Sequence, residues 1–140
     1  MKRLYFIVLS LLIFSACDPR KVNTEDPSDR PGVQATFENV NAEKFQELIQ
    51  SGAGIIVDVR TLAEIQQGFI PNAVGIDIYQ KDFEEKIKAL PRDKEIYVYC
   101  TVGARSRQAA AILQRNGFKK IYNLDGGIID WARKRYPITR

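Results

Sequence analysis

The 140-residue chain contains no histidine, two cysteines and one tryptophan. The absence of histidine excludes a histidine general base, and two thiols alone do not make the ligand set of a zinc site. Lysine and arginine outnumber aspartate and glutamate by 21 to 17, a net charge of +4. This excess is too small, and too little interleaved with aromatic residues, for a nucleic-acid-binding surface. We therefore expect no metal, no cofactor and no nucleic-acid partner.

The chain also has little that could span a bilayer. Its N-terminal apolar run, residues 4–16, is shorter than the roughly 20 residues that a transmembrane helix needs. The run follows a basic Met-Lys-Arg start, a pattern that predicts a cleaved export signal. Residues 14–17 read Phe-Ser-Ala-Cys, and this ending resembles a bacterial lipoprotein signal in which Cys17 is acylated. A plain signal peptide with an incidental cysteine and an uncleaved anchor are the alternatives.

The segment after Cys17 lacks the apolar side chains that a folded core requires. Residues 18–32 are polar and charged and contain three prolines, so they predict a flexible tether. We expect a lipoprotein signal peptide at residues 1–16, the acylated cysteine with its tether at 17–35, and a folded domain at 36–140. The chain is then expected in the cell envelope, lipid-anchored to a bacterial membrane and facing the periplasm or the cell surface. Cleavage removes two basic residues and leaves a net charge of about +2. It also leaves one free thiol and no intramolecular disulfide.

The folded part alternates short apolar strands with amphipathic helices. The expected helices are residues 41–50, 61–68, 83–90, 105–116 and 129–134, and the expected strands are 55–59, 73–78, 96–99 and 120–124. Asn41 is placed to cap the first helix, and Thr61 with Glu64 forms a capping-box pattern before the second. Trp131 is expected to anchor the core from the last helix. This alternation predicts a single α/β domain with a central parallel sheet covered by helices on both faces.

The most informative stretch is residues 95–106, in which the strand at 96–99 delivers Cys100 into a short loop before a helix. Backbone N–H groups at a helix start, the helix dipole and a nearby guanidinium all favour thiolate over thiol. Lowering the pKa from about 8.5 to about 6.5 would make the thiolate the main form at neutral pH. We expect Cys100 to be the catalytic nucleophile; the alternative is a buried cysteine that only packs. The loop residues expected to hold an anion on its sulfur are Thr101, Val102, Gly103, Ala104, Arg105 and Ser106.

The Cys-x-x-Gly-x-Arg-Ser run at residues 100–106 resembles the active-site loop of the rhodanese homology domain, a sulfurtransferase family. Other stretches resemble the family in the same order, at residues 55–61, 68–73, 117–118 and 124–131. Phe69 stands where the family usually has histidine. The resemblance covers residues 36–136 and implies a rhodanese-like domain. It also implies that Cys100 takes a sulfane sulfur from thiosulfate or a persulfide and passes it to cyanide or a thiol.

Loop length separates this chemistry from that of related phosphatases. Four residues separate Cys100 from Arg105, as in the sulfurtransferases that the chain resembles, whereas cell-cycle dual-specificity phosphatases have five. In that longer register position 106 would be arginine, but it is Ser106. A larger ring of N–H donors fits phosphate rather than one sulfur atom. Phosphatase or arsenate reductase activity is therefore the weaker enzymatic alternative. A non-enzymatic sulfur carrier or docking module of the same fold stays open.

The sequence suggests roles for three charged residues near the expected site but does not fix all of them. Asp58 and Arg60, at the end of a core strand, are expected to support the scaffold rather than to catalyse. Arg105 has two possible roles, because arginine suits both substrate contact and an ion pair with Asp58 or Glu64.

Overall fold

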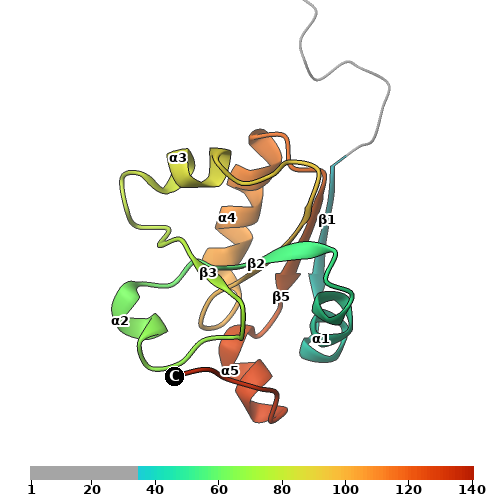
Figure 1. The fold of residues 1–140 in the computed structure, drawn as a ribbon, viewed down its shortest axis with the longest axis vertical. Coiled ribbons are helices and arrows are strands. Elements are labelled where there is room, and N and C mark those ends of the chain that lie inside the picture. Colours follow the sequence, from blue (N-terminus) through green and yellow to red (C-terminus); the bar gives the residue numbers. More distant parts are fainter. Residues whose placement is uncertain (1–34) are drawn as a thin grey trace, which may run out of the picture. The chain divides into compact units, whose positions relative to one another are not determined.

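The structure, a computed structural model, describes residues 35–140, which form a five-stranded sheet flanked by helices (Figure 1). The strands are β1 (Thr36–Val40), β2 (Gly54–Asp58), β3 (Val74–Gly75), β4 (Glu95–Tyr99) and β5 (Lys120–Leu124). Their order is β1-β5-β4-β2-β3, and every neighbouring pair is parallel. Within residues 35–140, no helix has the length and apolar character of a membrane span. The predicted signal peptide, Cys17 and the tether up to residue 34 lie outside the described residues.

Five helices connect and cover the strands. They are α1 (Ala42–Gln50), α2 (Leu62–Ile65), α3 (Phe83–Lys88), α4 (Ala104–Arg115) and α5 (Gly127–Arg133). The expected caps are confirmed: the Asn41 side chain accepts a hydrogen bond from the Lys44 N–H at 2.9 Å, and Thr61 and Glu64 form a capping box. Trp131 is 1% exposed and packs edge-on against Phe45, which confirms it as a core residue.

The sheet separates two hydrophobic clusters, because successive side chains of a strand point to opposite faces. In β4, Ile96 and Val98 pack in the cluster that includes side chains of α3 and α4, and Cys100 follows them on that face. Tyr97 and Tyr99 pack in the other cluster, with side chains of α1 and α5. The prediction of one α/β domain with helices on both faces of a parallel sheet is confirmed.

The two edge strands differ from expectation. β1 was not expected; its side chains are mostly exposed, so it lacks the apolar alternation that marks a strand. The strand expected at residues 73–78 is present, but its expected bounds are wrong, since β3 has only two residues, Val74–Gly75. Directly after β3, the Ile76 N–H donates to the Asp58 carbonyl at 2.8 Å. β2 itself ends at Asp58, because the Arg60 N–H turns back onto the Asp58 carboxylate at 3.0 Å.

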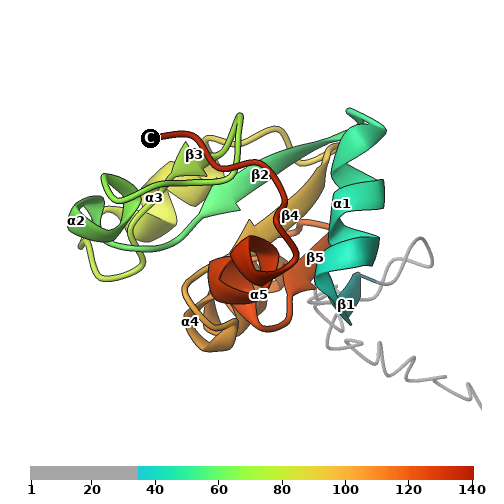
Figure 2. The same cartoon turned by 90° about the horizontal axis from the view of Figure 1, so that it is seen from below.

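The last residues of the chain return to the sheet. Figure 2 shows the C-terminal segment (red) running from α5 past β2 toward β3. Phe69 and Thr139 exchange backbone hydrogen bonds of 2.9 and 2.8 Å in an antiparallel bridge. The Trp131 indole N–H donates to the Pro137 carbonyl at 2.8 Å. The C-terminal segment is thus fixed both to α5 and to the turn that follows α2.

Candidate active site

Cys100 lies directly after β4, and three residues separate it from Ala104, where α4 begins. Its side chain is fully buried, and its Sγ accepts hydrogen bonds from the Gly103 N–H at 3.2 Å and from the Ser106 hydroxyl at 3.5 Å. Ser106 is itself fully buried, whereas Val102 is 56% exposed and Ala104, the first residue of α4, is also exposed. The structure therefore places the predicted loop around the sulfur, with polar groups from the helix start directed at it.

The hydrogen bonds around Cys100 decide the ionisation of its thiol. Burial raises the pKa of Cys100, because it removes water from the charged form. The Ser106 hydroxyl and the backbone N–H groups of Ser106, Val102 and Gly103 act against burial and hold this pKa below the ordinary value of a cysteine. Donors that favour the thiolate would equally favour a negative charge on a sulfur bound to it.

The N-terminus of α5 holds the backbone of the cysteine loop in place. The Ile128 N–H donates to the Cys100 carbonyl at 2.9 Å, and the Ile129 N–H donates to the Thr101 carbonyl at 3.3 Å. In a trans peptide the N–H points away from the carbonyl of the same unit. With both carbonyls turned toward α5, the N–H groups of Thr101 and Val102 point away from α5. The Gly103 N–H, next along the chain, donates to Sγ at 3.2 Å.

Gly127 permits this close approach of α5 to the loop. It has φ +60°, and a Cβ at this position would stand 2.5 Å from the Cys100 carbonyl oxygen and closer still to that of Thr101. Only glycine fits such a position without displacing the loop backbone. The Asp-Gly-Gly turn after β5 is therefore part of the architecture that shapes the site.

Asn123 is a site-supporting residue that sequence reasoning missed. It is fully buried on β5, and its Nδ2 donates to the Asn39 side chain at 2.8 Å and to the Gly103 carbonyl at 3.4 Å. The same Gly103 carbonyl oxygen lies 3.1 Å from the Ser106 hydroxyl, whose one proton is shared between this oxygen and Sγ. A polar residue inside the apolar Ile-Tyr-Asn-Leu strand was the available signal, because a buried amide needs partners.

Of the two roles open for Arg105, the structure shows the ion pair with Glu64. Arg105 Nη1 donates to Glu64 Oε2 at 2.8 Å and Nη2 to Oε1 at 2.5 Å. Thr101 closes the network, since its hydroxyl donates to Glu64 Oε1 at 2.7 Å and accepts from Arg105 Nη2 at 2.8 Å. The hydrogen bond from Arg105 holds the pKa of Glu64 far below its ordinary value. The Arg105 guanidinium also lies 5.7 Å from the centre of the Tyr79 ring.

Asp58 and Arg60 form a separate buried pair, as expected for scaffold residues. Arg60 Nη2 donates to Asp58 Oδ2 at 2.6 Å and to the Gly68 carbonyl at 2.8 Å, and its Nε donates to Asp58 Oδ1 at 2.9 Å. Burial lowers the pKa of Arg60, but the hydrogen bond and charge of Asp58 outweigh it, so this pKa is raised. The pair ties the end of β2 to the turn after α2, and its partners are not those of the Cys100 thiol.

Comparison with known proteins agrees with this architecture. The family model described as the rhodanese-like domain matches residues 41–134. A sulfurtransferase from Allochromatium vinosum is 41% identical over 94 residues, which cover 67% of this chain and 86% of that protein. A tRNA uridine(34) hydroxylase from Photorhabdus laumondii is 34% identical over 115 residues; they cover 79% of this chain but only 31% of that longer protein. Relatives that share the domain therefore differ in function.

Solved structures of the same kind are also similar. A rhodanese-related protein from Thermoplasma volcanium superposes with a TM-score of 0.65 at 34% identity, covering 73% of this chain and 97% of that one. A rhodanese-like domain protein from Staphylococcus aureus has a TM-score of 0.60 at 28% identity, covering 67% of this chain and 90% of that one. The chain described here belongs to the family of rhodanese-like domains.

Proposed function

We propose that this protein is a sulfurtransferase that carries a sulfane sulfur as a persulfide on Cys100. The family and the sulfurtransferase relative support sulfur transfer in general terms. The observation that carries the assignment to this residue is the surrounding of its Sγ. A buried thiol at a helix N-terminus accepts hydrogen bonds from Gly103 and Ser106, and its pKa is lowered despite burial.

The proposed reaction has two steps, each a displacement at sulfur. The Cys100 thiolate attacks the outer sulfur of thiosulfate, a new S–S bond forms, and sulfite leaves with the electron pair of the broken bond. Cyanide then attacks the terminal sulfur, thiocyanate leaves, and the Cys100 thiolate is regenerated. A persulfide donor and a thiol acceptor follow the same course, with a thiolate as the leaving group in the first step.

The residues around Cys100 have different parts in this reaction. The N–H groups of Val102, Gly103 and Ser106 stabilise the thiolate before the first step and the persulfide anion after it. Arg105 is a positioning residue, because its guanidinium is held by Glu64 and Thr101. The fully buried thiol favours a slender donor such as thiosulfate or a small persulfide over a bulky one.

Mass spectrometry of the full chain after incubation with thiosulfate tests the persulfide. We expect a gain of one sulfur atom on Cys100, its loss on addition of cyanide, and release of thiocyanate. C100S should abolish all three and keep the fold. C17S is the matched control, because it removes the other cysteine, and it should load sulfur normally.

The other outcomes distinguish the alternatives. Loading without turnover by any acceptor would favour a sulfur carrier over an enzyme. Failure of the reduced protein to take up sulfur from either donor would overturn the proposal and favour a docking module. Hydrolysis of an aryl phosphate without sulfur loading would point to the phosphatase alternative.

We also propose that the protein is attached to a bacterial membrane through a lipid on Cys17, with the domain on the periplasmic or outer side. The sequence of residues 1–17 supports this proposal. Metabolic labelling with a fatty acid and separation of membranes tests it. Label and protein should occur together in the membrane fraction, and C17S should lose both; retention of C17S in membranes with no label in the wild type would count against a lipid anchor.

A further inference from the structure

The hydroxyl of Ser106 has two acceptors within reach and only one proton. Its Oγ lies 3.1 Å from the Gly103 carbonyl oxygen and 3.5 Å from Cys100 Sγ. A hydroxyl donates to only one acceptor at a time. Serine in a helix readily donates to the carbonyl three or four residues earlier, and Gly103 stands three residues before Ser106. The nearer acceptor therefore competes with the thiol for the proton.

Two N–H groups already donate to the Gly103 carbonyl. The Arg107 N–H reaches it at 3.2 Å along α4, and Asn123 Nδ2 reaches it at 3.4 Å from β5. A carbonyl oxygen has two lone pairs, so these two donors fill its capacity. The proton of the Ser106 hydroxyl is then left for Cys100 Sγ.

The carboxamide of Asn123 offers its N–H side to this carbonyl at a cost. Its Nδ2 donates to Asn39 Oδ1 as well, at 2.8 Å, and a rotated amide would set its own oxygen against that of Gly103. The orientation leaves Asn123 Oδ1 buried without a hydrogen-bond partner among residues 35–140. An unpaired buried acceptor is destabilising and uncommon, and an apolar side chain at this position of β5 would avoid it.

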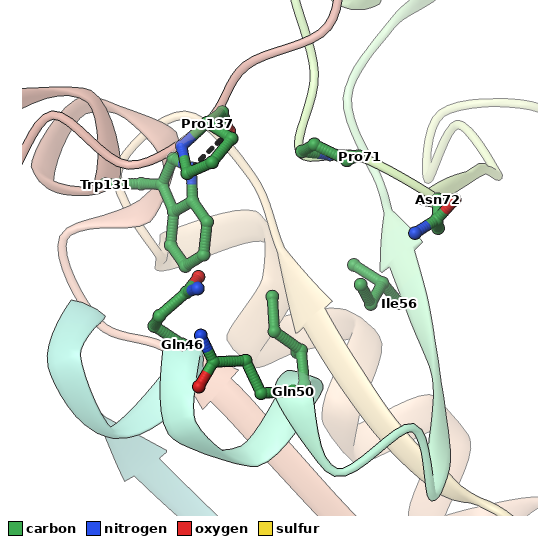
Figure 3. A pocket seen from close by; sticks show the side chains of 8 residues that line it. Gln46, Gln50, Ile56, Pro71, Asn72, Trp131 and Pro137 are labelled. Carbon is green, nitrogen blue, oxygen red and sulfur yellow. Dashed lines mark hydrogen bonds between the residues drawn. The ribbon is translucent and has the colours of Figure 1, made fainter.

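The other such oxygen in the described part of the chain lies away from the cysteine loop. It is Oε1 of Gln46, beside Trp131 at a pocket of about 240 Å³ between α1, the turn at Pro71 and Asn72, and the C-terminal segment (Figure 3). This pocket lies on the sheet face that carries α1 and α5. Asn123 contacts the cysteine loop from the opposite face, so its amide is the one placed to act on the site.

We infer that Asn123 is a positioning residue for the nucleophile: by occupying the Gly103 carbonyl, it directs the proton of the Ser106 hydroxyl to Cys100 Sγ. The inference rests on the function proposed for Cys100. Without Asn123 the hydroxyl turns to the carbonyl, and the thiolate loses one donor while the Gly103 N–H stays in place. Asn123 thus acts through Ser106 rather than on the sulfur itself.

The charged groups around the loop do not involve Asn123. They form pairs with each other, namely Arg105 of α4 with Glu64 of α2, Arg60 with Asp58 after β2, Arg107 of α4 with Asp125 after β5, and Arg133 with Asp130 on α5. The side chains of α3 that pack in the cluster of Cys100 are the apolar Phe83 and Ile87. A change in the ionisation of Cys100 on replacing Asn123 therefore reports on its hydrogen-bond donors rather than on a changed neighbouring charge.

The pH dependence of alkylation by iodoacetamide tests this inference. All variants carry C17S, so that Cys100 is the one thiol of the full chain. N123V removes the amide and suits a buried strand position. Below the midpoint of the curve, it should slow alkylation about two- to fivefold, as expected for the partial loss of one hydrogen bond, and the midpoint should move to higher pH. N123A is a second variant that does not depend on the fit of valine, and it should behave alike.

A double-mutant cycle with S106A assigns the effect to the hydroxyl. In the S106A background there is no hydroxyl proton to direct, so adding N123V should leave the alkylation rate unchanged. N39A is the matched control. It removes the other partner of the Asn123 amide from an exposed position of β1, and alone it should leave the rate unchanged.

Three results would overturn the inference. They are an unchanged alkylation curve for N123V and N123A that circular dichroism shows to be folded, equal slowing by N123V with and without Ser106, and equal slowing by N39A. Sulfur loading from thiosulfate is measured on the same proteins. If the wild type loads sulfur, any of these results leaves the proposed function intact. If the wild type fails to load, the proposed function is lost whatever the alkylation curves show.

Discussion

Glu64 and Arg105, 41 residues apart in the sequence, join α2 to the first turn of α4 through two parallel hydrogen bonds of 2.8 and 2.5 Å. The carboxylate of Glu64 also takes part in the capping box of α2 with Thr61, so its position is held independently of Arg105. The guanidinium therefore stands beside the cysteine loop as one half of a neutral pair. Attraction of an anionic donor then depends mainly on the N–H groups of the loop and the start of α4.

Replacing Glu64 by glutamine should destabilise the protein by about 1 to 3 kcal/mol at pH 7, because a charge-assisted bidentate pair is lost. The lowered pKa of Glu64 gives this effect a pH dependence. The stabilisation is complete above the pKa of the unfolded carboxyl, about 4.3, and is lost as the pH falls from there toward the folded value. Denaturant unfolding at pH 7 and pH 3 measures it. The gap between wild type and E64Q should narrow in acid, whereas the exposed control E85Q should show little gap at either pH. A gap that widens in acid would contradict the assignment.

Replacing Ser106 by alanine should raise the pKa of Cys100, since the variant removes one donor to Sγ and leaves the backbone donors in place. The pH dependence of alkylation by iodoacetamide gives this pKa, because the thiolate is the reactive form. In the wild type the midpoint should lie below that of an unfolded cysteine peptide. S51A, at the exposed end of α1, is the control and should leave the midpoint unchanged. Coincident curves for S106A and the wild type would show that the hydroxyl does not act on the thiol.

Replacing Gly127 by alanine should cost about 3 kcal/mol or more, because a Cβ there overlaps the backbone of Cys100 and Thr101. G52A is a matched control. Gly52 also has a positive φ, +67°, but an added Cβ would meet nothing within 4 Å, so only the backbone strain of about 1 kcal/mol applies. Thermal or denaturant unfolding compares the two. G127A should in addition slow alkylation of Cys100; equal costs for both variants would mean that α5 does not press against the loop.

Replacing Arg60 by leucine should destabilise the protein by about 3 to 5 kcal/mol, because it leaves the Asp58 carboxylate buried without its partner. R107L removes an exposed arginine whose ion pair with Asp125 is 3.3 Å long, and it should cost less than about 1 kcal/mol. Urea unfolding of both variants measures the difference. Losses of similar size would mean that the Asp58–Arg60 pair contributes no more than a surface pair.

The helices and strands could be predicted from the sequence where burial requires a regular pattern of apolar side chains. β2, β4 and β5 have runs of apolar side chains, and the caps of α1 and α2 follow from side chains that must pair with free N–H groups. β1 gave no such signal, since its place at the sheet edge leaves most of its side chains in water. The bounds of the strand expected at 73–78 were wrong for a related reason: apolar spacing shows which side chains are buried, but not where the neighbouring strand stops.

The site was readable to the level of the loop but not of its partners. Cys100, Gly103 and Ser106 lie close together in sequence, so their arrangement follows from a strand, a glycine and a helix start. The sequence did not decide whether Arg105 pairs with Asp58 or with Glu64, because this choice depends on the three-dimensional positions of β2 and α2. The pocket beside Trp131 brings together α1, a turn and the C-terminal segment, and no local pattern connects these parts.

The alternation of side chains along β4 has a consequence for how this domain can vary. Tyr99 is held on the α1 and α5 face, where its hydroxyl accepts the Ile70 N–H at 3.1 Å, and the next residue must therefore present its sulfur to the opposite face. Deleting or inserting one residue within β4 would turn the thiol to the wrong side of the sheet while preserving every residue of the loop. Substitutions after the cysteine can change the chemistry of the loop. The length of β4 can change only by an even number of residues if the thiol is to stay on the same face of the sheet.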